Sequence, residues 1–447
     1  MEALENILTQ ISDLLWGYPL IRLLFGTHVF LTFRLKIIQR FIGKAIKISL
    51  HRDKEGKGDI SQFGALTTAL AATIGTGNIV GVSTAVAAGG PGAVLWMWLT
   101  GVFGIATKYS EALLAVKYRV KMPDGSMAGG PMYVLERGLN MKWLAVLFAA
   151  FTSVTAFGIG NMVQANSIST LVNEAFQIPM WITGLVLTIL TAVVIIGGIK
   201  SIAKVCERLV PFMAITYVLG CLIILGMNIQ GIPDTVMLIL NSAFSGHAVV
   251  GGFLGAGMKE AIRFGIARGL FSNESGLGSA PIVAAAAQTK NPVRQALVSS
   301  TGTFWDTVVV CAMTGLVIVN SGEWIKGLSG AALTKQAFSD FHIVGPIVLT
   351  LGLLTFVFST ILGWSYYGEK AAEYLFGNKV VKPYRYLWVM FVMIGSVMSL
   401  NVVWTFADIT NALMAVPNLV SLLLLSGVIA SETKKYLWED KLDDAGE

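Results

Sequence analysis

The stretch that decides the fold is "LTTALAATIGTGNIVGVSTAVAAGGPG", residues 66–92. Its length and apolar composition suit a membrane-spanning helix, which needs roughly 20 apolar residues. Its middle, Gly75-Thr76-Gly77-Asn78, instead favours a helix break. Because no water in the bilayer core can satisfy a freed backbone group, such a break is tolerated only where it is buried in protein or lines a cavity. The stretch therefore predicts an interrupted helix inside a membrane protein.

The composition supports the same class. The 447 residues are 55% hydrophobic and only 13% charged, whereas soluble proteins average about 25% charged residues. The net charge of +6 is expected from basic cytoplasmic loops, and no basic-aromatic pattern indicates a nucleic-acid partner. We predict an all-α polytopic membrane protein whose acidic N-terminal segment is retained.

The reactive residues do not form a catalytic or resident metal site. Cys206, Cys221 and Cys311 lie apart in apolar segments, so we predict no disulfide. The four histidines are scattered, and no nucleophile or nucleotide-binding motif is present. We therefore expect neither an enzyme nor a cofactor, and any pumping must draw on an ion gradient.

Apolar runs predict about eleven transmembrane helices. They fall near 13–34, 61–90, 92–116, 142–172, 179–198, 205–228, 250–287, 293–319, 345–367, 384–400 and 401–430. Residues 36–51 and 231–246 look amphipathic or interfacial.

The distribution of lysine and arginine predicts the orientation. With the N-terminus outside, the basic segment 34–58 and most other Lys and Arg residues face the cytoplasm, as does the C-terminal tail. The outside loops then hold only Lys326 and Lys335. We expect a multi-pass protein of the plasma membrane with its C-terminus in the cytoplasm.

A second apolar segment, residues 263–288, has a similar polar interruption, "SNESG" at 272–276. If the first helix is set aside, the two interrupted segments are the first and sixth of ten spans. Matched interruptions in inverted halves are a pointer to a transporter site. We predict an N-terminal helix (1–35), a basic amphipathic segment (36–60), a five-helix repeat (61–228), an interfacial segment (229–249), a second, inverted five-helix repeat (250–430) and a tail (431–447).

The breaks have chemistry that suits a zwitterion. The freed N–H groups of one half-helix bind an anion, and the carbonyl end of the other suits an ammonium group or sodium. We predict that Thr76, Gly77 and Asn78 donate N–H groups to a carboxylate, with Gly75 and Gly77 allowing close approach. Carbonyls of Thr73, Phe271 and Ser272 would accept from the amine. The alternative is that these glycines only permit close helix packing.

Four motifs carry a resemblance: "TALAATIGTGNIVGVSTAVAAGGPGAVLWMW", "TKYSEALLAVKYR", "GGPMYVLERG" and "GLFSNESGLGSAP". Over residues 60–430 the chain resembles the alanine or glycine:cation symporter family. The resemblance implies a LeuT-type fold and sodium- or proton-coupled uptake of small amino acids. It also implies a sodium site in which Ala71 and Ile74 contribute carbonyls.

The eighth core helix would complete that sodium site. Phe356, Ser359 and Thr360 have the i, i+3, i+4 spacing that places them on one helix face. The alternative is that the two hydroxyls bond only to their own helix.

Several polar residues inside the spans are further candidates. Glu274 could face the substrate ammonium, carry a proton or hold the break through backbone N–H groups. Asn273 and Gln164 could present amides to the substrate, and Gly276 could act as a hinge. Asp306 and Asp408 also interrupt apolar runs, and Lys108, Arg263 or Arg268 could pair with them.

The predicted function is symport of sodium with alanine, glycine and D-alanine by a protein for which a monomer suffices. Proton-coupled uptake of the same substrates and a sensor that binds an amino acid without moving it remain alternatives. A channel or a membrane-embedded enzyme fits less well, because there is no sign of a continuous pore or a reactive cluster.

Overall fold

The computed structural model describes residues 2–51, 56–244, 257–398 and 401–444. Within these residues the protein is almost entirely helical, and its strands are one short antiparallel hairpin, β1 (Val120–Lys121) and β2 (Met127–Ala128). The predicted boundary at 249/250 falls outside the described residues.

The expected N-terminal span at 13–34 is divided into two helices, α1 (Glu2–Leu15) and α2 (Tyr18–Arg34). Gly17 caps α2, and a proline in the first turn of α2 favours a new helix start. The expected amphipathic segment is helical, as η1 (Ile38–Phe41) and α3 (Ile42–Ser49).

The first interrupted segment is confirmed. It comprises α4 (Gln62–Thr73), the π-helical η2 (Gly77–Gly81) and α5 (Val82–Gly89), with a bend of 55° at the break. The Ser61 side chain caps α4 by accepting a hydrogen bond from Gly64 N at 2.8 Å. The long helix α6 (Ala93–Lys117) follows.

The segment between the two breaks begins with the hairpin, α7 (Pro131–Tyr133) and η3 (Val134–Gly138). A continuous helical run then combines α8 (Lys142–Thr155), η4 (Ala156–Met162) and α9 (Val163–Phe176). It is followed by α10 (Met180–Ile195), α11 (Gly198–Met227), η5 (Ile229–Gly231) and α12 (Ile232–Phe244).

The second interruption is also present, but the expected span to residue 287 is wrong in its second half. Helix α13 (Met258–Asn273) ends at the predicted break, and only one short helix, α14 (Pro281–Ala284), forms before α15 (Pro292–Thr303). Gly276 and Gly278 have φ of +92° and +88°, a conformation that favours glycine over other residues and interrupts the helix.

The remaining elements are η6 (Phe304–Cys311), α16 (Ala312–Ser321), η7 (Glu323–Lys326), α17 (Gly330–Ser339), α18 (Val344–Phe376), η8 (Asn378–Val380), α19 (Val381–Val397), α20 (Asn401–Leu424), α21 (Ser426–Thr433) and η9 (Lys434–Trp438). Helix α17 was not expected from the sequence. Helix α20 ends before the predicted limit at residue 430.

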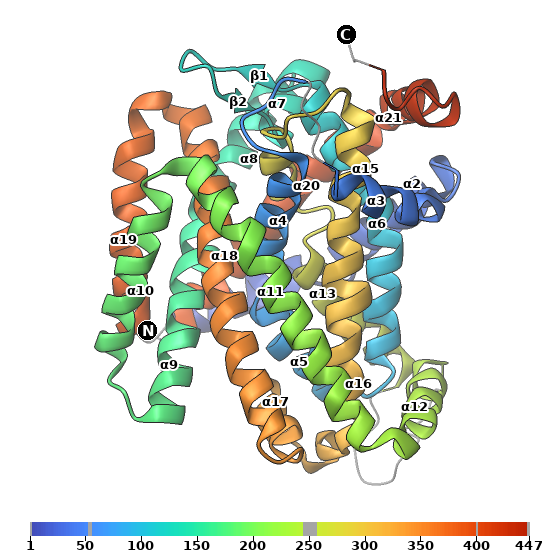
Figure 1. Cartoon of the computed structure of the whole chain (residues 1–447), viewed down its shortest axis with the longest axis vertical. Helices are drawn as coiled ribbons and strands as arrows, with labels where there is room; N and C mark the ends of the chain where they lie inside the picture. The colour runs from blue at the N-terminus through green and yellow to red at the C-terminus, as the bar shows by residue number, and fades with distance from the viewer. Residues whose placement is uncertain (1, 52–55, 245–256, 399–400, 445–447) are drawn as a thin grey trace.

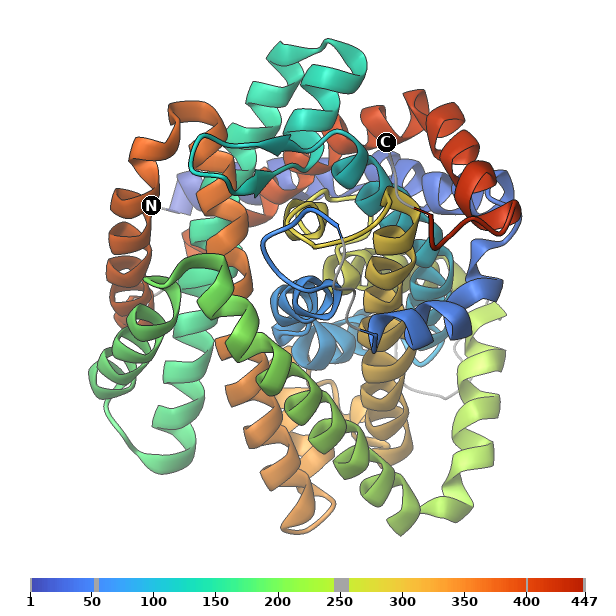
Figure 2. The same cartoon turned by 45° about the horizontal axis from the view of Figure 1, so that its top comes forward.

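The long helices run between two ends of the molecule. The hairpin, α7 and α21 lie at one end, and α12 and α17 lie at the other (Figure 1). Figure 2 shows the first broken segment, in blue, surrounded by other helices. Helix α18 packs against α4, and α6 packs against α13 and α15. Among the described residues five helices are long and apolar enough to cross a membrane, or six if the bent pair is one span.

Candidate functional site

The first break is stabilised by the side chain of Asn78. The side-chain atom Asn78 Oδ1 accepts a hydrogen bond from Gly75 N at 2.8 Å, and the backbone N–H of Asn78 donates to Gly75 O at 3.3 Å. Ile74 is extended, with φ −75° and ψ 97°, so α4 ends there. The Asn78 N–H that the sequence assigned to a carboxylate is thus bonded within the break.

The five residues predicted to hold sodium meet where α18 contacts the first break. Ser359 Oγ lies 3.1 Å from Ala71 O and 2.8 Å from Phe356 O. Thr360 Oγ1 lies 3.4 Å from Ile74 O and 3.0 Å from Phe356 O. The hydroxyls therefore bond to their own helix and also reach across to α4.

All five residues of this cluster are at most 2% exposed. Neutral carbonyl and hydroxyl oxygens are hard ligands, which suit a hard cation such as sodium. A β-carbon at Gly75 would lie 2.7 Å from Thr360 Oγ1, so glycine is needed for this close approach.

Glu274 occupies the point at which α13 ends. Its backbone is left-handed, with φ +54°. Ser279 Oγ donates to Glu274 Oε2 at 2.5 Å, and Trp364 Nε1 donates to Oε1 at 3.1 Å. Glu274 is 5% exposed. Its carboxylate thus joins the second break to α18 through side chains, and not through the backbone N–H groups considered from the sequence.

The backbone N–H groups of the second break are held by Glu111 on α6. Glu111 Oε1 accepts hydrogen bonds from Gly276 N at 3.0 Å, Gly278 N at 3.1 Å and Asn418 Nδ2 at 2.7 Å. Asn418 Nδ2 also donates to Gly276 O at 2.9 Å. A carboxylate and an amide from two other helices therefore replace the hydrogen bonds that the non-helical chain lacks.

The two breaks face each other. A β-carbon at Gly77 would lie 3.4 Å from both Phe271 Cδ1 and Ser272 Cα. Asp306 bridges the breaks, because its Oδ1 accepts from Asn78 Nδ2 at 2.7 Å and its Oδ2 accepts from Ser272 Oγ at 3.0 Å. Asp306 is fully buried, and its nearest bonds are to neutral groups, not to the cations suggested by the sequence.

Two amide side chains beside the breaks keep unused hydrogen-bonding atoms. Gln164 donates through Nε2 to Ile159 O at 2.9 Å, and its buried Oε1 has no hydrogen-bond partner among the described residues. Asn273 Oδ1 accepts from Ser275 N at 2.9 Å, while its Nδ2 is buried without a described partner. Gln164 Oε1 also lies near Gly75, so it can accept from a ligand at the first break.

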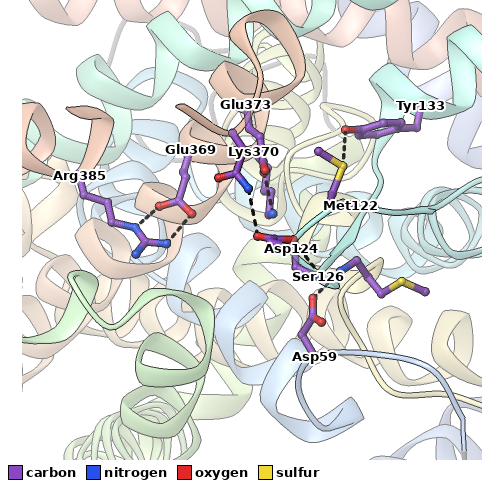
Figure 3. A network of polar contacts seen from close by, with 11 residues as sticks. Asp59, Met122, Asp124, Ser126, Tyr133, Glu369, Lys370, Glu373 and Arg385 are labelled. Atoms are coloured by element: carbon purple, nitrogen blue, oxygen red, sulfur yellow. Dashed lines mark hydrogen bonds and ion pairs between the residues drawn. The ribbon is translucent and has the colours of Figure 1, made fainter. Parts of the chain in front are cut away.

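A polar network surrounds one end of α18 (Figure 3). Arg385 forms two hydrogen bonds with Glu369, at 2.5 and 2.8 Å, and Lys370 Nζ lies 2.7 Å from Glu373 Oε2. These residues line a pocket of about 370 Å³ together with Tyr366, two turns beyond the hydroxyl cluster on the same helix.

The tip of the β1–β2 hairpin closes one side of this pocket. Asp124 accepts hydrogen bonds from Ser126 N at 2.9 Å and Ser126 Oγ at 2.7 Å, and from Asn378 Nδ2 at 3.3 Å. The bonds from Ser126 hold the pKa of Asp124 below its ordinary value, and the charge of Lys370 adds to this shift. At the hairpin base, Met127 N donates to Asp59 Oδ2 at 2.8 Å (Figure 3).

The predicted site residues are therefore close together in two groups, the oxygen cluster on α4 and α18 and the two facing breaks. Sequence reasoning missed Glu111, Asn418 and Trp364 as partners of the second break. Glu111 could have been found as a charged residue within the apolar run of α6. Asn418 and Trp364 carry no such signal, because their partners are distant in sequence.

Known proteins resemble this chain along its full length. The model of the "Sodium:alanine symporter family" matches residues 1–446. The "Sodium/alanine symporter AgcS" of Methanococcus maripaludis is 51% identical over 442 residues, covering 96% of this chain and 97% of that protein. The "Probable sodium/glutamine symporter GlnT" of Bacillus subtilis is 36% identical, covering 98% of this chain and 92% of that protein.

Among solved structures, MhsT in complex with L-phenylalanine is similar in fold. The TM-score is 0.56 at 16% identity, with 88% of this chain and 94% of that chain covered. This likeness supports the LeuT-type fold. The full-length family match and the identity to AgcS show that this multi-pass membrane transporter belongs to the sodium:alanine symporter family.

Proposed function

We propose that this protein couples sodium influx to uptake of alanine, glycine and D-alanine across the plasma membrane. The observation that carries the proposal is the buried cluster of five oxygen-bearing residues, on α4 and α18, beside two facing helix breaks. The family establishes sodium-coupled amino acid transport in general terms. The choice of small substrates rests mainly on the family, and also on the close approach of Phe271 to Gly77, whose β-carbon would lie 3.4 Å from Phe271 Cδ1.

The proposed membrane arrangement has about eleven spans, with an N-terminal helix followed by two inverted five-helix repeats. The N-terminus lies outside and the C-terminus inside, as the basic loops require. The hairpin and the polar pocket at the end of α18 are then cytoplasmic. A monomer contains every residue of the proposed site.

The substrate would bind between the breaks. Its carboxylate would accept from the N–H groups of Thr76 and Gly77, and its ammonium would donate to Gln164 Oε1, the buried acceptor without a described partner. The contact between Phe271 and Gly77 would limit the length of the substrate side chain. Because both charged ends meet backbone or amide groups, we expect weak discrimination between L- and D-alanine.

One sodium ion would bind at the oxygen cluster. Ala71, Ile74 and Phe356 would contribute carbonyls, and Ser359 and Thr360 would contribute hydroxyls. Moving one charge through 100 mV yields about 2.3 kcal/mol, and a tenfold sodium gradient adds about 1.4 kcal/mol. The sum, about 3.7 kcal/mol, corresponds to accumulation of a zwitterion by several hundred-fold.

The transport cycle would be alternating access, in which the broken segments and α6 rock against α18 and its neighbours around the central site. Sodium bound at the cluster would connect α4 to α18, because its ligands come from both. In this way the ion would favour the conformation that holds substrate. Proton coupling and a non-transporting sensor remain the competing functions.

The test is uptake of labelled alanine into proteoliposomes with a sodium gradient, with a proton gradient and with neither. Accumulation above equilibrium with sodium alone supports the proposal, and competition by D-alanine supports the expected substrate range. Accumulation driven only by a proton gradient would mean that a titratable group, and not the sodium site, couples the ion gradient to transport. Saturable binding without accumulation would identify a sensor.

A further inference from the structure

An apolar groove of about 550 Å³ lies between α3, α4, α11 and η6. Figure 1 shows α11 crossing in front of α4, and the two helices are in contact. The buried side of the groove is formed by Leu70, Ile74 and Val310, which are all at most 6% exposed. Its rim includes Ile215 and Leu219, which are more than half exposed. The groove therefore opens sideways from the first broken segment to the surface of the protein.

The lining of the groove suits a hydrocarbon chain. Ser49 and Thr67 are its two hydroxyl-bearing residues. Ser49 Oγ donates to Ile46 O at 2.7 Å, and Thr67 Oγ1 donates to Phe63 O at 3.0 Å. Both hydroxyls are thus satisfied within their own helices. An apolar ligand gains from burial against such a surface, whereas a polar ligand would lose hydrogen bonds to water there.

The length of the groove matches one leaflet of a bilayer. On α11 it extends from Val210 to Leu219, nine residues, which corresponds to a rise of about 13.5 Å. Half of the hydrocarbon core of a bilayer is about 15 Å thick. Helix α11 begins at Gly198, which lines the polar pocket beside the hairpin. The groove therefore lies in the leaflet at that end of the molecule and reaches inward to the first break.

Two cationic side chains lie at the outer end of the groove. Lys47 is one turn before Leu50, a groove residue on α3. Arg208 on α11 precedes the groove residues Pro211 and Ile215 by three and seven positions, so it shares their helix face. Both cations are exposed, and neither forms an ion pair with another described residue.

The acidic groups on the same elements are already engaged. Glu207 Oε1 accepts a hydrogen bond from Ser61 Oγ at 2.6 Å, at the start of α4. Asp440 lies 3.6 Å from Lys44 Nζ on α3. Lys47 and Arg208 therefore remain to balance a negative charge at the membrane surface. Long basic side chains at this depth place their charges among the lipid headgroups.

We propose that this groove binds an acyl chain of an anionic phospholipid, whose headgroup is held by Lys47 and Arg208. Each basic residue near a membrane surface favours an anionic lipid by about fivefold, equivalent to 1 kcal/mol. Together the two residues should favour an anionic over a zwitterionic lipid by up to about 25-fold. The site is distinct from the substrate and sodium positions, so it does not depend on the proposed function.

Trp305 provides a direct probe, because it lines the groove and is 37% exposed. The protein is reconstituted with phosphatidylglycerol or phosphatidylcholine brominated at the acyl-chain double bond, each in a background of unlabelled phosphatidylcholine. The quenching of fluorescence that is lost in Trp305→Phe reports occupancy of the groove. Brominated phosphatidylglycerol should reach half-maximal quenching of Trp305 at a mole fraction at least about fivefold lower than brominated phosphatidylcholine.

Trp98 is the matched control, because it is also 37% exposed but lies on α6 and not in the groove. The quenching lost in Trp98→Phe should be the same for both lipids. Ala214→Phe, which fills the groove, should reduce the quenching of Trp305 by both lipids and leave that of Trp98 unchanged. Equal quenching of Trp305 by the two lipids, or no loss of quenching in Trp305→Phe, would overturn the proposal.

The double variant Lys47→Gln/Arg208→Gln tests the headgroup contacts. It should abolish the preference for phosphatidylglycerol at Trp305, and high salt should weaken the same preference in the wild type. Lys335→Gln is the control, because Lys335 is an exposed lysine on α17, at the other end of the molecule (Figure 1). A double variant that keeps the preference of the wild type would refute the role of the two cations.

Discussion

Replacing Thr360 by valine tests the sodium site with little change in shape. The substitution exchanges one hydroxyl for a methyl group, and so removes the oxygen that lies 3.4 Å from Ile74 O and 3.0 Å from Phe356 O. A hydrogen bond or ligand contact to a charged group contributes about 1.5–3 kcal/mol. The half-saturating sodium concentration should therefore rise by about ten- to 150-fold.

The assay is the sodium dependence of alanine uptake in proteoliposomes at saturating alanine. Thr355→Val is the matched control, since among the described residues Thr355 Oγ1 on the same helix bonds only to Leu351 O and Gly352 O within α18. An unchanged half-saturating concentration in Thr360→Val would refute the site. An equal change in both variants would mean that the hydroxyls act only within their own helix.

Three further predictions follow from contacts around the breaks. Gly75→Ala should weaken sodium binding in the same assay, because the new β-carbon would lie 2.7 Å from Thr360 Oγ1. Gly81→Ala is the control and should be neutral, because a β-carbon at Gly81 would have no described atom within 4 Å. Glu111→Ala should lower the free energy of unfolding by about 3 kcal/mol or more, because the backbone amides of Gly276 and Gly278 lose their carboxylate acceptor. Thermal unfolding measures this, and an unchanged Tm would contradict the role of Glu111. Because the pKa of Asp124 is lowered, its contribution to the stability of the hairpin is fully present above about pH 4, near the ordinary pKa of aspartate. That contribution is lost as the pH falls through the lowered pKa. Hydrogen exchange at the hairpin should thus increase in acid, and Asp124→Asn should abolish that pH dependence.

Much of the functional core could be predicted from local sequence. The motif Gly75–Asn78 fixes the first break because a polar, glycine-containing segment cannot continue a lipid-facing helix. The spacing of Phe356, Ser359 and Thr360 predicts a shared helix face, and the structure brings that face to the first break. The irregular chain after α13 was harder to predict, since its alanine-rich composition resembles a helix while its glycines and prolines prevent one.

The sequence by itself determined that the chain is a membrane transporter with two interrupted segments, because hydrophobic length and helix breaking are local properties. Only the tertiary structure decided what stabilises those interruptions. Glu111 and Asn418 are far from Gly276 in sequence, yet they supply its hydrogen bonds. A buried polar group has a partner only when another element brings one to it, and that is a property of the fold.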